Sequence, residues 1–586
     1  MNEDVTFSIV GSGGDGAVVA GDLAAMACAA QGLNVIKTEA YGPQIRGGES
    51  SSTVRIAAKK LAAQGDAIDA LIVFRFADFA RFRSEMTLSE GCIVLHEPDD
   101  PPPPELASFR CVPTPFGQLA RDAGAPGAKN IAALGIIAAM FGLPVESIRT
   151  AVRKRFKKRD AAIIDANLRA LDHGITWSEG LAARRTRFDA MTSTTPHLLM
   201  SGNEATAFGA LHAGCSFFAG YPITPSTEIL QLLAEWLPKI GGSCLQTEDE
   251  LAAIGAVVGA SFAGAKSMTA TSGPGLSLMS EMLGLSSIAE IPSVVVNVQR
   301  GGPSTGIPTK SEQSDLFHAL YGGHGDMPRV VLACCDVEDA FHTTVDAFNI
   351  AEEFQVPVIV LSDQAIAQRR ETIDAGSLVH EVVSRRIATE PDDSYERYAI
   401  TDDGVSPMTV PGIANGMYQT NGLEHDEQGR PSSMFVTHER MNAKRHRKLD
   451  AIARKYPLYR RFGADKPELG ILCWGSSEGP VREAVQRMND AGARVAAFVP
   501  RALAPLPVSD LQAFIDSCQS ILIIELSFEA QFHRYLRSLV DLPRGADLPR
   551  GKTRVLARSG GKALSVMEVI EAAQLRGAGI LEEVTA

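Results

Sequence analysis

The stretch Gly220-Tyr221-Pro222-Ile223-Thr224-Pro225-Ser226-Thr227 gives the first firm indication of the fold. Its prolines stiffen a turn, and its hydroxyl side chains stand at the start of a helix predicted over 228–236. Two more loops, Thr247-Glu248-Asp249-Glu250 and Arg300-Gly301-Gly302-Pro303-Ser304-Thr305-Gly306, likewise follow a strand-like run and precede a helical pattern. This order is typical of βα crossovers and predicts that all three loops lie at one end of a parallel sheet. Ligands of open α/β sheets bind at that end.

The polar residues of these loops allow both a structural and a functional interpretation. A hydroxyl of Thr224 or Ser226 can cap free N–H groups of the following helix, or it can hold an anion against the helix N-terminus. Glu248 and Glu250 can be ordinary acidic residues of a first turn, which the helix dipole favours. Arg300 can pair with a surface acid, or its planar guanidinium can donate two parallel hydrogen bonds to a carboxylate.

A second glycine-rich loop lies near the start of the chain. Gly11-Ser12-Gly13-Gly14-Asp15-Gly16 follows the strand-like run 5–10 and precedes a helical run over 17–30, which is the context of a Gly-x-Gly-x-x-Gly phosphate loop. Glu39 follows the next strand-like run, 34–38, as the acidic residue of a dinucleotide-binding fingerprint would. The pattern alone predicts NAD binding, with a purely structural glycine turn as the alternative.

Bulk composition limits the classes of protein to be considered. A chain of 586 residues is too long for one hydrophobic core and implies three or four domains. Its net charge of −13 argues against nucleic acid as an obligate partner. The sequence shows neither a run of about eighteen apolar residues nor a signal-peptide pattern, so we expect a soluble, cytoplasmic protein without a membrane span. The nine cysteines include no Cys-x-x-Cys pair, so we expect no metal site and no iron–sulfur cluster on this chain.

Strand and helix patterns alternate through most of the remaining sequence. Helical patterns are predicted around 130–140 and over 145–171. Near-continuous valine and isoleucine runs occur at 293–299, 330–334 and 356–362, each followed or preceded by a helical pattern. Such runs predict strands of a parallel sheet that is covered by helices on both faces.

The string Tyr221 to Thr227, together with the glutamate pair and the arginine loop, resembles the α subunit of 2-oxoacid:ferredoxin oxidoreductases. These are thiamine-diphosphate enzymes that interconvert a 2-oxoacid and coenzyme A with an acyl-CoA and carbon dioxide. The segment 40–49, with its glycine-flanked Arg46, resembles the γ domain of the same family. The whole chain looks like the variant in which γ is fused ahead of α, common among 2-oxoglutarate enzymes. In that family the loop 11–16 faces coenzyme A or a subunit interface, which favours a γ-type role over NAD binding.

The resemblance implies an α/β, multidomain fold. A γ-type α/β domain would occupy 1–193, and the parallel-sheet pyrimidine domain of a thiamine-diphosphate enzyme would occupy 194–385. A polar insertion or linker would follow over 386–465, with its alternating charges mostly solvated. Residues 466–586 resemble the C-terminal domain of transketolase-type enzymes and would be chiefly architectural.

The resemblance also implies roles for single residues. Glu250 would be the catalytic carboxylate that binds N1′ of the aminopyrimidine ring, and it is favoured over Glu248 because Gly255 and Gly259 follow it at the spacing of related enzymes. Arg300 would bind the carboxylate of the 2-oxoacid. Further substrate contacts are assigned to Thr224, Ser226, Ser304, Thr305 and Lys310. Contacts to cofactors are assigned to Tyr221, Pro222, Ile223, Gly11, Gly13, Gly14, Gly16 and Arg46.

The sequence lacks a signature for binding the diphosphate of the cofactor. Gly14-Asp15-Gly16 contains the Gly-Asp-Gly tripeptide but has no matching asparagine pair downstream. The resemblance therefore implies a separate β subunit that shares the thiamine diphosphate, holds its Mg²⁺ and carries the [4Fe–4S] cluster. It also implies ferredoxin as a partner and a heterotetramer of composition (αβ)2.

The expected reaction is that of a 2-oxoglutarate synthase: 2-oxoglutarate, coenzyme A and oxidised ferredoxin give succinyl-CoA, carbon dioxide and reduced ferredoxin. Such an oxidoreductase can serve the tricarboxylic acid cycle or, in reverse, carbon dioxide fixation. Three alternatives stay open: a pyruvate or branched-chain 2-oxoacid oxidoreductase, an NAD-dependent oxidoreductase, and a non-catalytic scaffold subunit.

Overall fold

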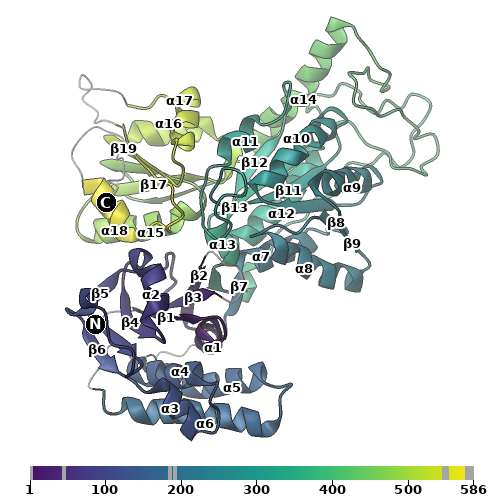
Figure 1. The fold of residues 1–586 in the computed structure, drawn as a ribbon. Coiled ribbons are helices and arrows are strands. Elements are labelled where there is room, and N and C mark those ends of the chain that lie inside the picture. The colour runs from purple at the N-terminus through teal and green to yellow at the C-terminus, as the bar shows by residue number, and fades with distance from the viewer. Residues whose placement is uncertain (1–3, 43–47, 182–187, 189–194, 544–552, 575–586) are drawn as a thin grey trace. The chain divides into compact units, whose positions relative to one another are not determined.

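The computed structural model describes residues 4–42, 48–181, 188, 195–543 and 553–574 (Figure 1). The chain forms two compact units. The first consists of Met1–Ser201, Gln368–Leu378 and Ser565–Met567, and the second of Gly202–Ala367, Val379–Leu564 and Glu568–Ala586. Three separate sheets confirm the predicted multidomain α/β fold. Within the ranges given above, no helix is both long and apolar enough to cross a lipid bilayer.

An eight-stranded mixed sheet forms the core of the first unit, in the order β6-β5-β4-β1-β3-β2-β14-β7. On one side of β1, the strands β4, β5 and β6 follow as parallel neighbours. On its other side, β3 lies between β1 and β2 and runs antiparallel to both. The strands are β1 (Asp4–Ser12), β2 (Asn34–Tyr41), β3 (Glu49–Ala57), β4 (Ile68–Val73), β5 (Leu88–His96), β6 (Arg110–Pro113), β7 (Leu198–Ser201) and β14 (Arg370–Ile373).

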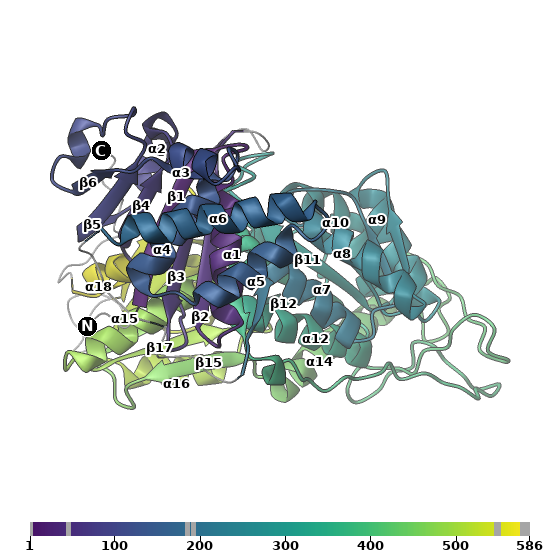
Figure 2. The ribbon, with the colours of Figure 1, turned by 90° about the horizontal axis from the view of Figure 1, so that it is seen from below.

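Helices of the first unit cover both faces of this sheet, with α1 and the helices around it on one face and α2 on the other. α1 contacts β1, β2 and β3, and α4 packs against α1 and α6; Figure 2 shows these helices side by side with α5. Nearly every residue of α4 is buried, as expected for a helix that is apolar on all sides. The helices are α1 (Ala17–Ala29), α2 (Phe76–Phe82), α3 (Phe116–Asp122), α4 (Lys129–Phe141), α5 (Val145–Arg155) and α6 (Ala161–Ser178).

The single helical pattern predicted over 145–171 forms two helices instead. α5 ends at Arg155, and α6 begins at Ala161. The last buried residue of α5 is Val152, and the basic side chains that follow are exposed. No apolar face therefore continues the first helix into the second.

The interpretation of the first glycine loop as an NAD fingerprint is wrong. A dinucleotide-binding βαβ unit places its first two strands side by side, but here β3 separates β1 from β2. Glu39 lies inside β2, where its carboxylate accepts hydrogen bonds from Lys37 Nζ and the Tyr41 hydroxyl. It is therefore not the free acid that the fingerprint requires at the end of the second strand.

Two short strands from beyond the predicted first domain complete its sheet. β14 pairs with β2, and β7 pairs with β14. The sequence-based boundary at 193/194 assigned both strands to the second domain. Each has only four residues, too few to show a periodicity from which its sheet could be recognised.

The second unit contains the predicted parallel sheet, in the order β18-β12-β13-β11-β10-β8-β9. All neighbouring strands run parallel except β18 at one edge. Every residue of β11 is buried, which explains its near-continuous valine sequence. The strands are β8 (Phe217–Gly220), β9 (Ser243–Gln246), β10 (Ser267–Thr271), β11 (Ser293–Gln299), β12 (Val330–Ala333), β13 (Pro357–Asp363) and β18 (Ala502–Ala504).

Helices cover both faces of this sheet, as Figure 1 shows. α9 packs against α10 on one face, and α7 packs against α8 and α12 on the other. The helices are α7 (Gly202–His212), α8 (Thr227–Trp236), α9 (Glu250–Phe262), α10 (Gly273–Ile288), α11 (Leu316–Tyr321), α12 (Val337–Phe354) and α13 (Gln364–Gln368).

A five-stranded sheet, in the order β15-β17-β16-β19-β20, forms the C-terminal part of the second unit. It matches the predicted βα alternation, except that β18 leaves it to pair with β12. The side chain of Arg501, just before β18, pairs with Asp339 and Asp346 of α12 and thereby directs the chain towards the other sheet. The elements are β15 (Tyr459–Gly463), β16 (Leu469–Leu472), α15 (Glu478–Asp490), β17 (Val495–Pro500), α16 (Val508–Ser517), β19 (Ser520–Glu525), α17 (Gln531–Leu539), β20 (Thr553–Ala557) and α18 (Val566–Gln574).

The region 386–465 is largely turns that lead into one long helix, α14 (Phe435–Lys455). The sequence suggested that the charges of this region are mostly solvated, but several of them are buried in ion pairs. Lys444 and Lys448 of α14 are buried, and each Nζ lies 2.5 Å from a carboxylate oxygen of Glu290. Arg397 Nη2 donates a hydrogen bond of 2.8 Å to the carbonyl oxygen of Glu290. These two ion pairs and this hydrogen bond hold the region against the C-terminal end of α10.

Candidate active site

The three loops singled out in the sequence lie at one end of the seven-stranded sheet. β8, β9, β10 and β11 run parallel, so the loops that follow them share one edge. Arg300, directly after β11, donates a hydrogen bond of 2.6 Å from Nη1 to the carbonyl oxygen of Thr224 in the first loop. The predicted convergence of these loops is therefore confirmed.

Glu250 is the first residue of α9 and is almost fully buried at this edge. Asp249 caps the helix, because its side chain accepts a hydrogen bond of 2.8 Å from Ala252 N. The Glu250 side chain is thus free of a capping role; the residue is only 6% exposed, and its carboxylate forms no hydrogen bond or ion pair with any other residue that the structure describes. Glu248, by contrast, is exposed. A buried carboxylate without an internal partner is costly, which points to a partner outside the chain.

The first turn of α10 lets this carboxylate lie close to the backbone. A Cβ atom added to Gly275 would lie 2.6 Å from Glu250 Oε1 and 2.0 Å from Thr271 Oγ1. A side chain at this position would therefore displace the Glu250 carboxylate. The glycine is thus required for the present position of Glu250.

Arg300 supplies a buried cation to the same edge. It is 6% exposed, and its Nε is buried without a hydrogen-bond partner. Among the described residues, no carboxylate forms an ion pair with it. Burial lowers the pKa of Arg300 from its ordinary value, and the negative charge of Asp315 opposes this shift. The guanidinium therefore has donors available for an anionic ligand.

The first loop brings the hydroxyls of Thr224 and Ser226 to this edge. Ser226 is buried, and its hydroxyl donates a hydrogen bond of 3.0 Å to the carbonyl oxygen of Ile223, so it stabilises the turn. The side chain of Thr224 is half-buried and makes no hydrogen bond within the described part of the chain. Pro222 is also half-buried, whereas Tyr221 is exposed.

The third loop has a buried base and an exposed tip. A bridge between Gly301 and Ile307 closes it into a small hairpin. Ser304 and Thr305 lie at the exposed tip, and Lys310 follows the hairpin in a half-buried position. The tip residues thus differ in exposure from the buried Arg300, whereas the backbone of Lys310 returns to the base of the loop, where its carbonyl oxygen accepts a hydrogen bond of 2.9 Å from Gly301 N.

Sequence reasoning missed residues that hold the site in place. Asn203 of α7 donates hydrogen bonds of 2.9 Å to the carbonyl oxygen of Pro225 and to Glu228 Oε2, which fixes the first loop. Asp315 accepts a hydrogen bond of 2.9 Å from Asn297 Nδ2. Burial raises the pKa of Asp315, and this hydrogen bond opposes the shift. No sequence motif surrounds these residues, so only the fold brings them to the site.

The glycine loop of the first unit is filled by its own side chain. Asp15 Oδ2 accepts a hydrogen bond of 2.9 Å from Ser12 N, and Lys129 Nζ lies 2.8 Å from Asp15 Oδ1. Gly13 N donates to the carbonyl oxygen of Gly48. The amides of Ser12 and Gly13 are therefore already satisfied inside the protein, and the loop has little capacity left for a pyrophosphate. Arg46, which the sequence placed with these glycines, lies outside the described residues.

The cysteines form neither disulfides nor a metal site. All nine are free, and burial raises the thiol pKa of Cys334 to about 12. Within the ranges that the structure describes, no group of three or more histidine, cysteine, aspartate or glutamate side chains could hold a metal ion.

Two family models match the chain. Residues 208–444 match the model described as pyruvate flavodoxin/ferredoxin oxidoreductase, thiamine diphosphate-binding. Residues 6–177 match the model described as pyruvate ferredoxin/flavodoxin oxidoreductase. The first match includes the three loops of the candidate active site, and the second includes the eight-stranded sheet up to β6 with its helices.

Similar proteins cover most of the chain. The 2-oxoglutarate oxidoreductase subunit KorA of Mycobacterium tuberculosis is 32% identical over 551 residues, which are 86% of this chain and 83% of that protein. The 2-oxoglutarate synthase subunit KorA of Methanothermobacter thermautotrophicus is 36% identical over 364 residues, or 61% of this chain and 94% of that protein. A solved structure of 2-oxoglutarate:ferredoxin oxidoreductase from Magnetococcus marinus, with 2-oxoglutarate, coenzyme A and succinyl-CoA bound, superposes with a TM-score of 0.92 at 36% identity and covers 98% of this chain and 99% of that one.

Proposed function

Because the chain belongs to the family of 2-oxoacid:ferredoxin oxidoreductase α subunits, we propose that its substrate is 2-oxoglutarate. With coenzyme A and oxidised ferredoxin, the complex would form succinyl-CoA, carbon dioxide and reduced ferredoxin. The three similar proteins described above are all named for 2-oxoglutarate, which supports this substrate over pyruvate or a branched-chain 2-oxoacid.

The observation that carries the proposal is the unpartnered, buried carboxylate of Glu250. Its position at the C-terminal edge of a parallel sheet, packed closely against Gly275, supports a role on the N1′ side of an aminopyrimidine ring. Bound thiamine diphosphate supplies the nucleophilic carbon and the electron sink for decarboxylation. Glu250 would hold the N1′ proton and orient the ring.

Arg300 and Thr224 form the proposed clamp for the substrate carboxylate. The hydrogen bond from Arg300 Nη1 to Thr224 O fixes the guanidinium and leaves the buried Nε free to donate. The Thr224 hydroxyl is also without an internal partner. A carboxylate common to all 2-oxoacids can accept from both groups. We keep Lys310, Ser304 and Thr305 as contacts to the more distant parts of the substrate.

We further propose that this chain acts only with a β subunit, in a cytoplasmic (αβ)2 complex. The sequence offers Glu250 for the pyrimidine but no motif for the diphosphate and its Mg²⁺, which the β subunit would hold together with the [4Fe–4S] cluster. Ferredoxin would receive the electrons. Coenzyme A would approach the first unit near Gly14 and Gly16.

The proposal can be tested by reconstituting the complex and measuring viologen reduction with coenzyme A and a panel of 2-oxoacids. We expect the highest specificity constant for 2-oxoglutarate and no reduction by the isolated chain. A higher constant for pyruvate or a branched-chain 2-oxoacid would overturn the substrate assignment. Full turnover after Glu250→Gln would support the scaffold alternative instead. Stoichiometric iron on the isolated chain would contradict the assignment of the cluster to the partner.

A further inference from the structure

The C-terminal five-stranded sheet has the strand order of a doubly wound α/β domain. β16 has β17 as its parallel neighbour on one side and β19 on the other, with β20 beyond β19. The chain passes from β16 to β17 and then crosses to β19, so the direction of winding reverses between β16 and β19. In sheets of this kind, ligands bind beyond the carboxyl ends of the two strands at such a switch point.

A side chain of the same polypeptide occupies the position beyond β16 and β19. Gln313 is fully buried, and its Nε2 donates a hydrogen bond of 2.7 Å to the carbonyl oxygen of Trp474, which follows β16. Its Oε1 accepts a hydrogen bond of 2.9 Å from the backbone N–H of Leu526, which follows β19. The backbone N–H of Gln313 donates in turn to the carbonyl oxygen of Leu526, at 2.7 Å. Gln313 thus connects the ends of both strands at the switch point.

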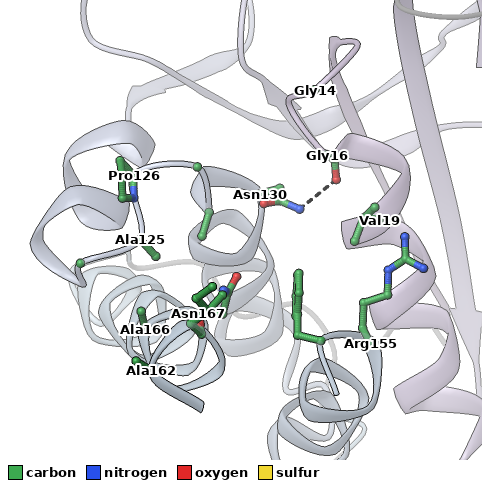
Figure 3. Close-up of a pocket in the computed structure, with 15 residues that line it drawn as sticks. Gly14, Gly16, Val19, Ala125, Pro126, Asn130, Arg155, Ala162, Ala166 and Asn167 are labelled. Atoms are coloured by element: carbon green, nitrogen blue, oxygen red, sulfur yellow. Dashed lines mark hydrogen bonds between the residues drawn. The ribbon is translucent and has the colours of Figure 1, made fainter. Parts of the chain in front are cut away.

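The glycine loop of the first unit shows the opposite situation. This loop follows β1 and borders a cavity of about 570 Å³, which Gly14, Gly16 and Asn130 help to line (Figure 3). That loop therefore has free space beside it. Beyond β16 and β19, by contrast, the backbone groups of Trp474 and Leu526 already have a partner within the chain.

The C-terminal sheet also binds the residues that follow Gln313. Gln531 of α17 donates a hydrogen bond of 2.8 Å from Nε2 to the carbonyl oxygen of Ser314, and its Oε1 accepts one of 2.9 Å from Phe317 N. We call residues 310–317 the clamp segment. Gly475, with φ of +59°, makes room for it, because a Cβ atom there would lie 2.7 Å from Gln313 Nε2.

The clamp segment is also hydrogen-bonded to both chain neighbours of Arg300. Asp315 N donates a hydrogen bond of 3.1 Å to Oε1 of Gln299, the residue before Arg300. Gly301 N, directly after Arg300, donates one of 2.9 Å to the carbonyl oxygen of Lys310. Arg300 therefore lies between two hydrogen bonds to the clamp segment, whose middle is fixed to the C-terminal sheet. A shift of this segment would move the guanidinium with it.

We propose that Gln313 is a positioning residue for the substrate carboxylate and acts through Arg300. By fixing the clamp segment to the ends of β16 and β19, it keeps the guanidinium where the carboxylate of a 2-oxoacid binds. The C-terminal sheet, for which the sequence resemblance implied a chiefly architectural role, thereby sets the affinity for the substrate. Gln313 has this role only if Arg300 binds the substrate as proposed above.

Gln313→Met tests this role, because methionine has a similar length but cannot form these hydrogen bonds. In the reconstituted complex, we expect KM for the 2-oxoacid to rise about tenfold and kcat to stay within about twofold, because carboxylate binding is weakened and the chemical step is not. The dissociation constant of N-oxalylglycine, a nonreactive analogue of 2-oxoglutarate, should rise by the same factor in calorimetry. A merely structural role would lower the fraction of folded complex, and with it kcat per total protein, at an unchanged KM. That result would overturn the proposal.

Two other glutamines of the C-terminal sheet provide matched comparisons. Gln531→Met removes the second amide that holds the clamp segment and should also raise KM. Gln512→Met is the control, because the Gln512 amide holds the backbone of Asp541 instead, at 2.8 Å from Asp541 N and 3.3 Å from its carbonyl oxygen. KM should stay unchanged in this control. An equal rise of KM in Gln512→Met and Gln313→Met would reveal a general loosening of the domain and contradict the positioning role.

A double-mutant cycle separates this role from the proposed function. If Gln313 acts through Arg300, Gln313→Met should raise KM by no more than about twofold when it is added to Arg300→Ala. A full additional tenfold rise would show that Gln313 acts independently of Arg300. An unchanged KM after Arg300→Ala alone would instead disprove the substrate role of Arg300 in the proposed function.

Discussion

Glu250 and Glu290 lie in the same compact unit and are both buried, but their surroundings are opposite. Glu290 is 1% exposed and has two lysine partners, Lys444 and Lys448, each 2.5 Å from a carboxylate oxygen. These charges hold the pKa of Glu290 well below its usual range, despite the opposing effect of burial. Glu250 is 6% exposed and has no such partner in the described part of the protein.

The arginines repeat this contrast. Arg385 forms a two-pronged ion pair with Glu352, at 3.0 Å from Nε and 2.9 Å from Nη2, and also donates to Ser261. Arg300 is equally buried but has an Nε without any acceptor. An unpaired buried charge destabilises a fold, and a ligand carboxylate beside Arg300 would offset that cost. The internally paired residues are thus structural, whereas Glu250 and Arg300 are the groups that we propose to bind ligands.

Replacing Glu250 with glutamine should have the largest effect. The amide keeps the size of the side chain but cannot hold the ring N1′ proton as a carboxylate does, so kcat in the reconstituted complex should fall by about 10²–10⁴. The free energy of unfolding should stay the same or rise, since no internal ion pair is lost. Glu248→Gln is the matched control and should retain activity; the reverse result would transfer the role to Glu248.

Glu290→Gln should lower the free energy of unfolding and leave the catalytic step unaffected. It leaves the buried ammonium groups of Lys444 and Lys448 without a counter-charge, which typically costs about 3–5 kcal/mol of unfolding free energy. Urea titration followed by circular dichroism measures this loss. Glu235→Gln, which breaks an exposed pair with Lys239, is the control and should cost less than about 1 kcal/mol. Equal stability of the Glu290 variant and this control would contradict the structural role.

The features that depend on a local sequence pattern could be predicted from the sequence. The loop order predicted the parallel sheet, and the Gly255 and Gly259 spacing favoured Glu250, which is buried, over Glu248, which is exposed. The burial of Lys444 could not be predicted in the same way. Its helix reads as a charged surface helix, and its partner Glu290 lies 154 residues earlier in the chain. Long-range pairing leaves no periodic signal in either segment.

Arg300→Ala should lower the specificity constant for every 2-oxoacid by about ten- to a hundredfold. The loss of a charge-assisted hydrogen bond costs about 1.5–3 kcal/mol, and the carboxylate that Arg300 binds is common to all of these substrates. Arg300→Lys restores the charge but not the fork of donors, so it should recover only part of the loss. Steady-state kinetics that show 2-oxoglutarate impaired and pyruvate spared would place Arg300 at the distal end of the substrate instead.

The last expected effect is a pH dependence of stability that Lys448 introduces. Burial lowers its pKa to about 7, Lys444 and Arg397 act in the same direction, and Glu290 opposes them. The folded chain therefore releases this proton near pH 7, whereas the unfolded chain keeps it up to the ordinary lysine range. Between these values the unfolded state binds more protons, so the free energy of unfolding rises with pH, by at most about 1.4 kcal/mol per unit.

Lys448→Met isolates this contribution, because methionine has a similar unbranched shape and no charge. We compare urea unfolding of both proteins at steps between pH 7 and 9.5. The wild-type free energy should rise relative to that of the variant across this interval, and the two should run parallel below pH 6, where Lys448 is protonated in both states. Parallel curves throughout would mean that Glu290 keeps Lys448 charged in the folded protein, and that the two lysines share its carboxylate as full cations.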